Sequence, residues 1–167
     1  MNKTPSSTYK IRFNDCDMFG HLNNARYLDY MINARQDHLQ EEYNFDITEY
    51  YKNNIGWVAG SHEIVYLKPA LYNEAVSIQS QLINADTFLL HVETIMTDAD
   101  RKHVKAVMRT KLIPVNIQTG RRKAHKPELL EWVLSLIDTE SDLKADFQER
   151  IKQVIHQSKQ NNKIYLL

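Results

Sequence analysis

The sequence predicts one α+β unit in which a long helix lies against a curved antiparallel sheet of about five strands. Two patterns indicate it. Residues 24–42 contain neither glycine nor proline, and their apolar side chains cover most of the helix circumference over the first three turns. A helix of that kind is buried on most sides. The segments 57–68, 75–84, 87–97 and 103–115 alternate apolar and polar residues, as strands with one buried face do.

The elements before the sheet follow from local signals. Residues 8–14 (TYKIRFN) alternate and predict a first strand. Either Asn23 or Asn24 suits the N-cap of the long helix, because an amide oxygen accepts a hydrogen bond from the first turn. Residues 46–53 predict a short helix.

The turns between the later strands hold Asn, Asp and Glu residues and are short. Short turns join neighbouring strands as hairpins, so the four strands from residue 57 onward predict an antiparallel meander. The long helix then crosses this sheet.

Two further helices are expected after the sheet, at 127–137 with Pro127 in its first turn and at about 142–159. We divide the chain into a domain at 1–137 and a helical extension at 138–167. This extension packs on the same domain or on a partner subunit, through one apolar stripe: Leu143, Phe147, Ile151, Val154 and Ile155.

Composition excludes several classes. Hydrophobic residues make up 43% of the 167 residues and charged residues 25%, as in globular proteins. Lys plus Arg and Asp plus Glu number 21 each, so the net charge is zero, and nucleic-acid binders are usually basic. We expect no membrane span, because no apolar run is long enough. The start lacks a signal-peptide pattern and Cys16 is the single cysteine, which favours the cytoplasm.

The four glycines are scattered along the chain. Dinucleotide-binding loops, P-loops and the serine hydrolase elbow need glycines at fixed short spacings. Nucleotide-dependent chemistry and a serine triad are therefore both disfavoured.

The segment 15–28 (DCDMFGHLNNARYL) concentrates chemistry between a strand and the start of the long helix. A helix N-terminus offers free N–H groups and a partial positive charge, which suit a developing oxyanion. A nearby carboxylate, Asp15 or Asp17, could serve as nucleophile or general base. The same residues equally suit a turn in which the carboxylates only accept hydrogen bonds from backbone N–H groups.

This segment resembles the opening signature of the 4-hydroxybenzoyl-CoA thioesterase-like family, D-x-D-x-x-G-H-x-N-N-x-x-Y-(L). Residues 64–70 (IVYLKPA) and 119–121 resemble later parts of that family more loosely, and the likeness extends over about residues 8–133. The resemblance implies a hot-dog fold, in which an antiparallel sheet wraps a long helix. It also implies a homodimer or homotetramer with active sites at the subunit interface.

The resemblance implies hydrolysis of an acyl-CoA thioester to free acid and coenzyme A. Asp17 matches the family's catalytic carboxylate, as nucleophile or general base, and the Asn24 backbone N–H matches the donor that polarises the thioester carbonyl. Gly20, His21 and Asn23 would orient the loop or the substrate, and Tyr27 would line the pocket or the core. No cofactor is implied beyond the coenzyme A of the substrate.

After the glycine the chain reads His-Leu-Asn-Asn, which resembles the broader acyl-CoA branch more than the hydroxybenzoyl members. An aliphatic acyl group is therefore favoured over an aromatic one. Aromatic residues Tyr50, Tyr51 and Trp57 suit either an acyl tunnel or ordinary core packing. The basic run at 121–126 suits a solvated loop or contacts to the phosphates of coenzyme A.

The main alternative function is a hot-dog protein that binds acyl-CoA without hydrolysing it. A dehydratase is disfavoured, since that reaction needs a histidine placed for proton abstraction. A cation held by Asp15, Asp17 and His21 is also disfavoured, because the spacing does not fit a calcium loop; we expect no metal. Cys16 lies between two carboxylates, which disfavour its thiolate as a nucleophile.

Overall fold

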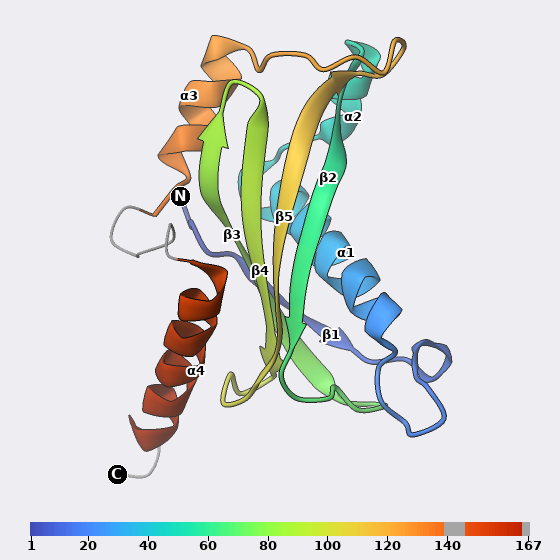
Figure 1. The fold of residues 1–167 in the computed structure, drawn as a ribbon, viewed down its shortest axis with the longest axis vertical. Coiled ribbons are helices and arrows are strands. Elements are labelled where there is room, and N and C mark those ends of the chain that lie inside the picture. Colours follow the sequence, from blue (N-terminus) through green and yellow to red (C-terminus); the bar gives the residue numbers. More distant parts are fainter. Residues whose placement is uncertain (139–145, 165–167) are drawn as a thin grey trace.

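The computed structural model describes residues 1–138 and 146–164. In this part of the chain the sheet contains five strands, and the helices lie against it (Figure 1). The elements in chain order are β1 (Ser6–Lys10), the 3-10 turn η1 (Phe13–Asp15), α1 (Asn24–Tyr43), α2 (Ile47–Lys52), β2 (Ile55–Tyr66), β3 (Ala75–Asp86), β4 (Leu89–Asp98), β5 (Val104–Asn116), α3 (Pro127–Ser135) and α4 (Phe147–Ile164).

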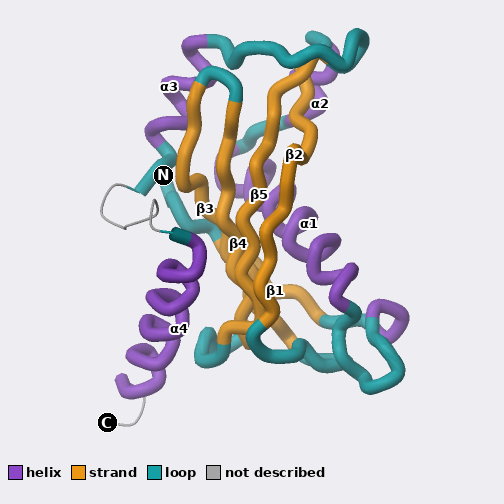
Figure 2. Tube along the Cα trace, viewed as in Figure 1, coloured by secondary structure: helices purple, strands orange, loops and turns teal. Residues whose placement is uncertain are grey.

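The strands are antiparallel and lie in the order β1-β3-β4-β5-β2 (Figure 2). The predicted meander is therefore right for β3, β4 and β5 but wrong for β2, which pairs with β5 at the far edge. The segment 67–74 is not a tight hairpin. Its end bonds instead to the residue after β1, because Asn73 N–H donates to the Ile11 carbonyl (3.0 Å) and Ile11 N–H to the Glu74 carbonyl (2.9 Å).

The first strand is also shifted from its predicted position. It covers residues 6–10, and residues 13–15 form η1 instead of continuing it. Phe13, which the alternation assigned to a strand face, is 77% exposed. The chain leaves the sheet at this point to build the loop that precedes α1.

One face of α1 packs on the sheet. Its buried residues are Tyr27, Met31, Ala34 and His38, whose spacing places them on one side of the helix. Ile32 on another side is 41% exposed, so the prediction of a helix buried on most sides is wrong for the single chain. The physical reason is that five strands cover only the face they contact.

The sheet separates two apolar layers. Met96 and Met108 belong to the core beneath α1, whereas their neighbours Ile95 and Val107 pack with α4. Successive residues of a strand point to opposite faces, so α4 lies on the face away from α1. The structure describes Phe147, Ile151, Val154 and Ile155 of the predicted stripe in this contact; Leu143 lies outside the described residues.

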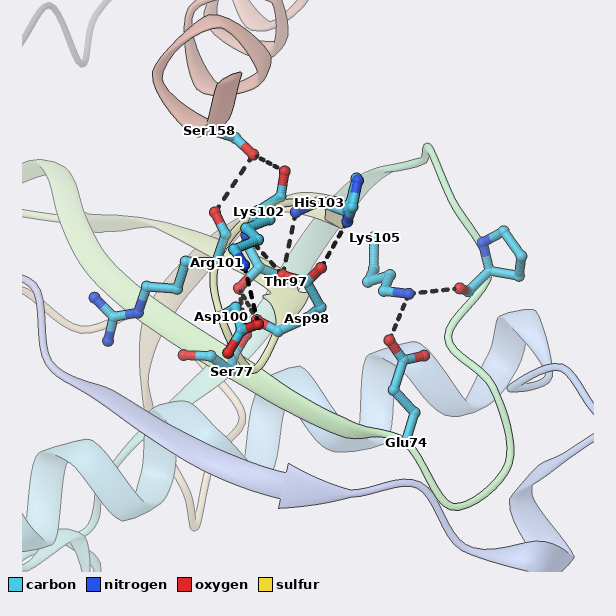
Figure 3. Close-up of polar contacts among 11 residues, drawn as sticks. Glu74, Ser77, Thr97, Asp98, Asp100, Arg101, Lys102, His103, Lys105 and Ser158 are labelled. Carbon is cyan, nitrogen blue, oxygen red and sulfur yellow. Dashed lines mark hydrogen bonds and ion pairs between the residues drawn. The ribbon is translucent and has the colours of Figure 1, made fainter. Parts of the chain in front are cut away.

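A buried carboxylate fixes α4 to the sheet. Glu93 on β4 is fully buried, and it accepts hydrogen bonds from Gln81 Nε2 (2.7 Å), Arg109 Nε (3.0 Å) and Arg150 Nε of α4 (2.9 Å). Further along the helix, Ser158 Oγ donates to the Lys102 carbonyl at 2.6 Å, which docks α4 on the turn between β4 and β5 (Figure 3). Buried charges require such partners, since removal from water is costly.

Glu93→Gln should lower the free energy of unfolding by about 3 kcal/mol, because it removes the buried negative charge that Arg109 and Arg150 share. Urea denaturation of both proteins measures this. Glu149→Gln on the exposed side of α4, where the pair with Lys152 faces solvent, is the matched control and should change stability by less than about 0.5 kcal/mol. Equal effects of the two substitutions would contradict the assigned role of Glu93.

Candidate active site

The loop before α1 is a tight turn closed by its own backbone. Asp17 N–H donates to the His21 carbonyl (2.8 Å) and Gly20 N–H to the Asp17 carbonyl (3.1 Å). Gly20 has φ +73°, a left-handed conformation that costs other residues steric strain. The side chain of Asp17 joins this turn: Oδ1 accepts from Phe19 N–H (2.9 Å) and His21 N–H (3.1 Å).

Asp17 therefore uses one carboxylate oxygen to shape the loop. Its other oxygen, Oδ2, has no hydrogen-bond partner among residues 1–138 and 146–164, and the side chain is exposed. The turn-capping role considered for this residue is thus present in the structure, and it leaves an oxygen available for chemistry.

Asp15 points elsewhere. Its Oδ2 accepts from the Tyr30 hydroxyl (2.8 Å), and Oδ1 lies 3.6 Å from Arg26 Nε. It lines a separate cavity with Tyr30 and Arg26. The two carboxylates of the sequence signature consequently act on different sides of the loop.

The start of α1 leaves one donor open. Asn23 is the N-cap, and its side chain accepts from Ala25 N–H at 3.0 Å. The Asn24 carbonyl accepts from the Tyr66 hydroxyl (3.0 Å). The Asn24 N–H has no acceptor in the part of the chain that the structure describes, as expected of the first residue of a helix.

Asp17 and Asn24 line the same cavity of about 240 Å³. It lies between the loop, the first turn of α1 and the end of β2, and it also contains His21 and Tyr27. Its remaining walls are Leu22, Tyr66, Leu67, Lys68 and Pro69. The structure therefore brings the candidate carboxylate, the helix N-terminus and a lysine to one water-accessible hollow.

The segment 67–74 supports this cavity from behind. Leu22 N–H donates to the Ala70 carbonyl (2.8 Å), and Tyr72 N–H donates to the Gly20 carbonyl (2.9 Å). Tyr27 is 2% exposed, and its hydroxyl accepts from Ala70 N–H at 2.9 Å. Tyr27 thus joins the core of α1 to the wall of the cavity.

Two charged residues hold that segment in place and were missed in the sequence. Lys105 Nζ donates to the Pro69 carbonyl (3.0 Å) and pairs with Glu74 Oε1 at 2.6 Å (Figure 3). Glu74 Oε2 in turn accepts from Leu71 N–H (2.8 Å). The available signal was a lysine at the start of a strand, between the apolar residues Val104 and Ala106, where an unpaired charge would be costly.

The thiol and the buried phenol near Asp17 stay protonated at neutral pH. Burial raises the pKa of the Cys16 thiol, and the charges of Asp15 and Asp17 raise it further, so the thiolate is disfavoured. Burial likewise raises the pKa of the Tyr27 phenol. Among the acidic and thiol groups around the loop, Asp17 therefore remains the candidate base or nucleophile.

The basic run at 121–126 lies at the other end of the sheet from the Asp17 loop (Figure 1). Within it His125 is buried, and its Nε2 accepts from Trp57 Nε1 (2.9 Å) while Nδ1 lies 2.8 Å from the Asp86 carbonyl. This histidine holds the loop to β2 and β3, and the run does not reach the Asp17 cavity of the same chain.

A second cavity of about 250 Å³ lies further along α1, between this helix, α2 and the sheet. Tyr51 and Trp57 line it, as the tunnel interpretation expected, whereas Tyr50 is not among its wall residues. Most of the wall is apolar, including Met31, Leu39, Phe45, Ile47, Met108 and Leu112.

A model of the thioesterase-like superfamily matches residues 11–133, the region that contains the loop, α1 and the whole sheet from β2 to β5. The chain belongs to the thioesterase-like superfamily. This membership confirms the enzyme class predicted from the sequence, thioester hydrolysis.

Similar proteins of known sequence or structure are also thioesterases. The long-chain acyl-CoA thioesterase FadM of Escherichia coli (strain K12) is 29% identical over 130 residues, which cover 77% of this chain and 96% of FadM. The crystal structure of YbaW, a probable thioesterase from Escherichia coli, has 25% identity and a TM-score of 0.69 and covers 80% of this chain and 98% of its own. DHNA-CoA thioesterase from Staphylococcus aureus shares the fold at 16% identity, with a TM-score of 0.72 over 79% and 89% of the two chains. The hot-dog α+β fold is confirmed.

Gly20→Ala should lower turnover of a thioester substrate at least about tenfold, because a small displacement of the reacting groups is costly in rate. Gly120→Ala is the matched control: its φ is +66°, and like Gly20 it has open space around an added Cβ. Both substitutions should cost about 1 kcal/mol of stability, measured by denaturation. Equal turnover in the two variants would show that the shape of the Asp17 loop does not matter for catalysis.

Proposed function

We propose that the chain hydrolyses acyl-CoA thioesters, with Asp17 as nucleophile or general base and the Asn24 N–H as oxyanion donor. The observation that carries this proposal is one cavity lined by both residues, in which Asp17 Oδ2 and the Asn24 N–H lack partners among the described residues.

The chemistry follows from these two groups. A thioester carbonyl that accepts the Asn24 N–H lies at the positive end of the α1 dipole, which stabilises negative charge on its oxygen. Asp17 either attacks the carbonyl carbon, and water then hydrolyses the acyl-aspartate, or it takes a proton from the attacking water. In both routes the carbon–sulfur bond breaks and the sulfur leaves with a proton as free coenzyme A.

Two observations favour a long aliphatic acyl group. FadM is named a long-chain acyl-CoA thioesterase, and a second cavity with mostly apolar walls lies further along α1. The Asp17 cavity receives the thioester, and the acyl chain extends along α1 toward the second cavity. The reaction requires water and no cofactor beyond the coenzyme A of the substrate.

A homodimer, or a tetramer built from it, would complete this site. The edge strand β2 is long, and its exposed residues include Val58 (49% exposed) and Tyr66 (39% exposed). Unpaired edge strands with apolar side chains tend to be covered. Tyr66 and the residues after it form one wall of the Asp17 cavity, so a second copy seated along β2 would enclose the substrate.

The proposed reaction needs no nucleic-acid partner. No helix within the described residues has the length and apolar character needed to cross a membrane. The cytoplasmic location stays a prediction from the sequence.

Asp17→Asn should reduce kcat about 10³-fold or more on acyl-CoA substrates, because it removes the nucleophile or base while its Oδ1 can still accept the two turn hydrogen bonds. A thiol reagent that detects free coenzyme A measures turnover on acyl-CoAs of graded length and on benzoyl-CoA. Asp15→Asn, the neighbouring carboxylate that faces another cavity, is the control and should lose less than about tenfold.

Full turnover by Asp17→Asn would overturn the assignment of the catalytic carboxylate. Acyl-CoA binding without any turnover by the wild type would favour a binding protein in place of an enzyme.

A further inference from the structure

The second cavity beneath α1 has a positively charged side chain in its wall. Arg35 of α1 lines it among mostly apolar side chains. In the part of the chain that the structure describes, no carboxylate pairs with Arg35. The Arg35 side chain is half-buried, and a guanidinium that loses part of its hydration without a counter-ion costs free energy, which a bound anion would offset.

Arg35 also borders a smaller cavity of about 60 Å³ between α1, α3 and the sheet. Leu39 lines both spaces as well, so the two cavities adjoin at these residues. The small cavity is more polar at one side, where His38, Ser80 and Gln81 face it.

His38 supplies a second unused polar atom there. Its side chain is 2% exposed, and Nδ1 lies 2.7 Å from Ser80 Oγ. Nε2 is buried and has no hydrogen-bond partner within the described residues. When the Ser80 hydroxyl donates to Nδ1, the proton of the neutral imidazole is on Nε2, which is then a buried N–H without an acceptor in a side chain that lines this cavity.

Both groups are in the charge state that this arrangement needs. Burial lowers the pKa of Arg35 to about 10, which keeps the guanidinium charged at neutral pH. Burial also lowers the pKa of His38, so the imidazole is neutral and carries one N–H. A cation and a neutral donor next to each other complement a carboxylate, which accepts hydrogen bonds on both oxygens.

We propose that Arg35 and His38 bind a carboxylate at the far end of the acyl chain, so that the enzyme selects acyl-CoAs whose acyl group carries a second, terminal carboxylate. This inference rests on the proposed function, because it concerns the substrate of the Asp17 site. The small cavity, at about 60 Å³, has room for a carboxylate.

The helix sets the length of such a substrate. Asn24, which receives the thioester, and Arg35 lie on the same helix, about 16 Å apart along its axis at 1.5 Å per residue. Tyr27 of the first cavity and Met31 and Arg35 of the second follow one another at four-residue intervals, and residues so spaced share a helix face. A short diacid bound at the thioester site would not reach the guanidinium, whereas a medium or long chain would.

The test compares matched pairs of substrates with equal numbers of carbons, one plain acyl-CoA and one ω-carboxyacyl-CoA, from four carbons to sixteen. We expect the wild type to prefer the carboxylated member at least tenfold in kcat/KM within one window of length. Arg35→Met should lower that preference at least tenfold, and Arg35→Lys, which keeps the charge, should retain part of it. Arg101→Met on the exposed β4–β5 turn is the control and should leave the preference unchanged.

Calorimetry provides a readout that does not depend on turnover. Dodecanedioate and dodecanoate are titrated into the Asp17→Asn protein with and without Arg35→Met or His38→Asn, and the diacid should bind more tightly only when Arg35 and His38 are present. His38→Asn keeps an acceptor for the Ser80 hydroxyl but removes the Nε2 donor, and it should weaken the diacid severalfold.

The outcomes separate the two proposals. Hydrolysis of plain acyl-CoAs with no preference for a carboxylated chain at any length would overturn the Arg35 site and leave the thioesterase proposal intact. Absence of turnover on every substrate would overturn the thioesterase proposal, and tighter binding of the diacid would then still support the site. If Arg35→Met changes the oligomeric mass in light scattering but not the selectivity, Arg35 pairs with a second copy and the inference is wrong.

Discussion

The backbone hydrogen bonds between the Asp17 loop and the segment 67–74 are the constraint on which the site depends. Leu22 and Gly20 are tied to Ala70 and Tyr72, and this link determines where α1 begins relative to the end of β2. The helix start then needs acceptors for its free N–H groups. Asn23 accepts from Ala25 N–H, whereas the Asn24 N–H has no acceptor among the described residues, and Asn24 lines the same cavity as Asp17.

Buried ion pairs hold the two faces of the sheet to their neighbours. Lys105 joins β5 to the segment 67–74 through Glu74 and Pro69, whereas Glu93 joins α4 to β5 through Arg150 and Arg109. Each uses a strand residue as the fixed partner. Such pairs contribute little net stability relative to apolar packing. They do specify how the elements pack, because any other packing would leave a buried charge unpaired.

The sequence predicted the helices and strands better than it predicted which strands pair. The helix at 24–42 and the strands after residue 57 match α1 and β2 to β5 within a few residues, since hydrophobic periodicity is a local property. The position of β2 beside β5 could not be read, because strand order depends on pairing between distant residues. The signature likewise identified Asp15 and Asp17 together. Their separation into two cavities follows from side-chain contacts with Tyr30 and with the turn itself, which spacing alone does not reveal.

One helix carries both ends of the proposed substrate site. Its first turn supplies the N–H for the thioester, and Arg35 supplies a cation about 16 Å further along. Because an α-helix is stiff over this distance, the separation does not adjust to the ligand, in contrast to a pocket whose two ends lie on different loops. A diacid chain of matching length contacts the helix N-terminus through its thioester and Arg35 through its carboxylate. A shorter chain makes only the thioester contact. In this proposal α1 itself therefore sets the length of acyl chain that the site accepts. The charge on Arg35 adds a second requirement, a carboxylate at the end of that chain.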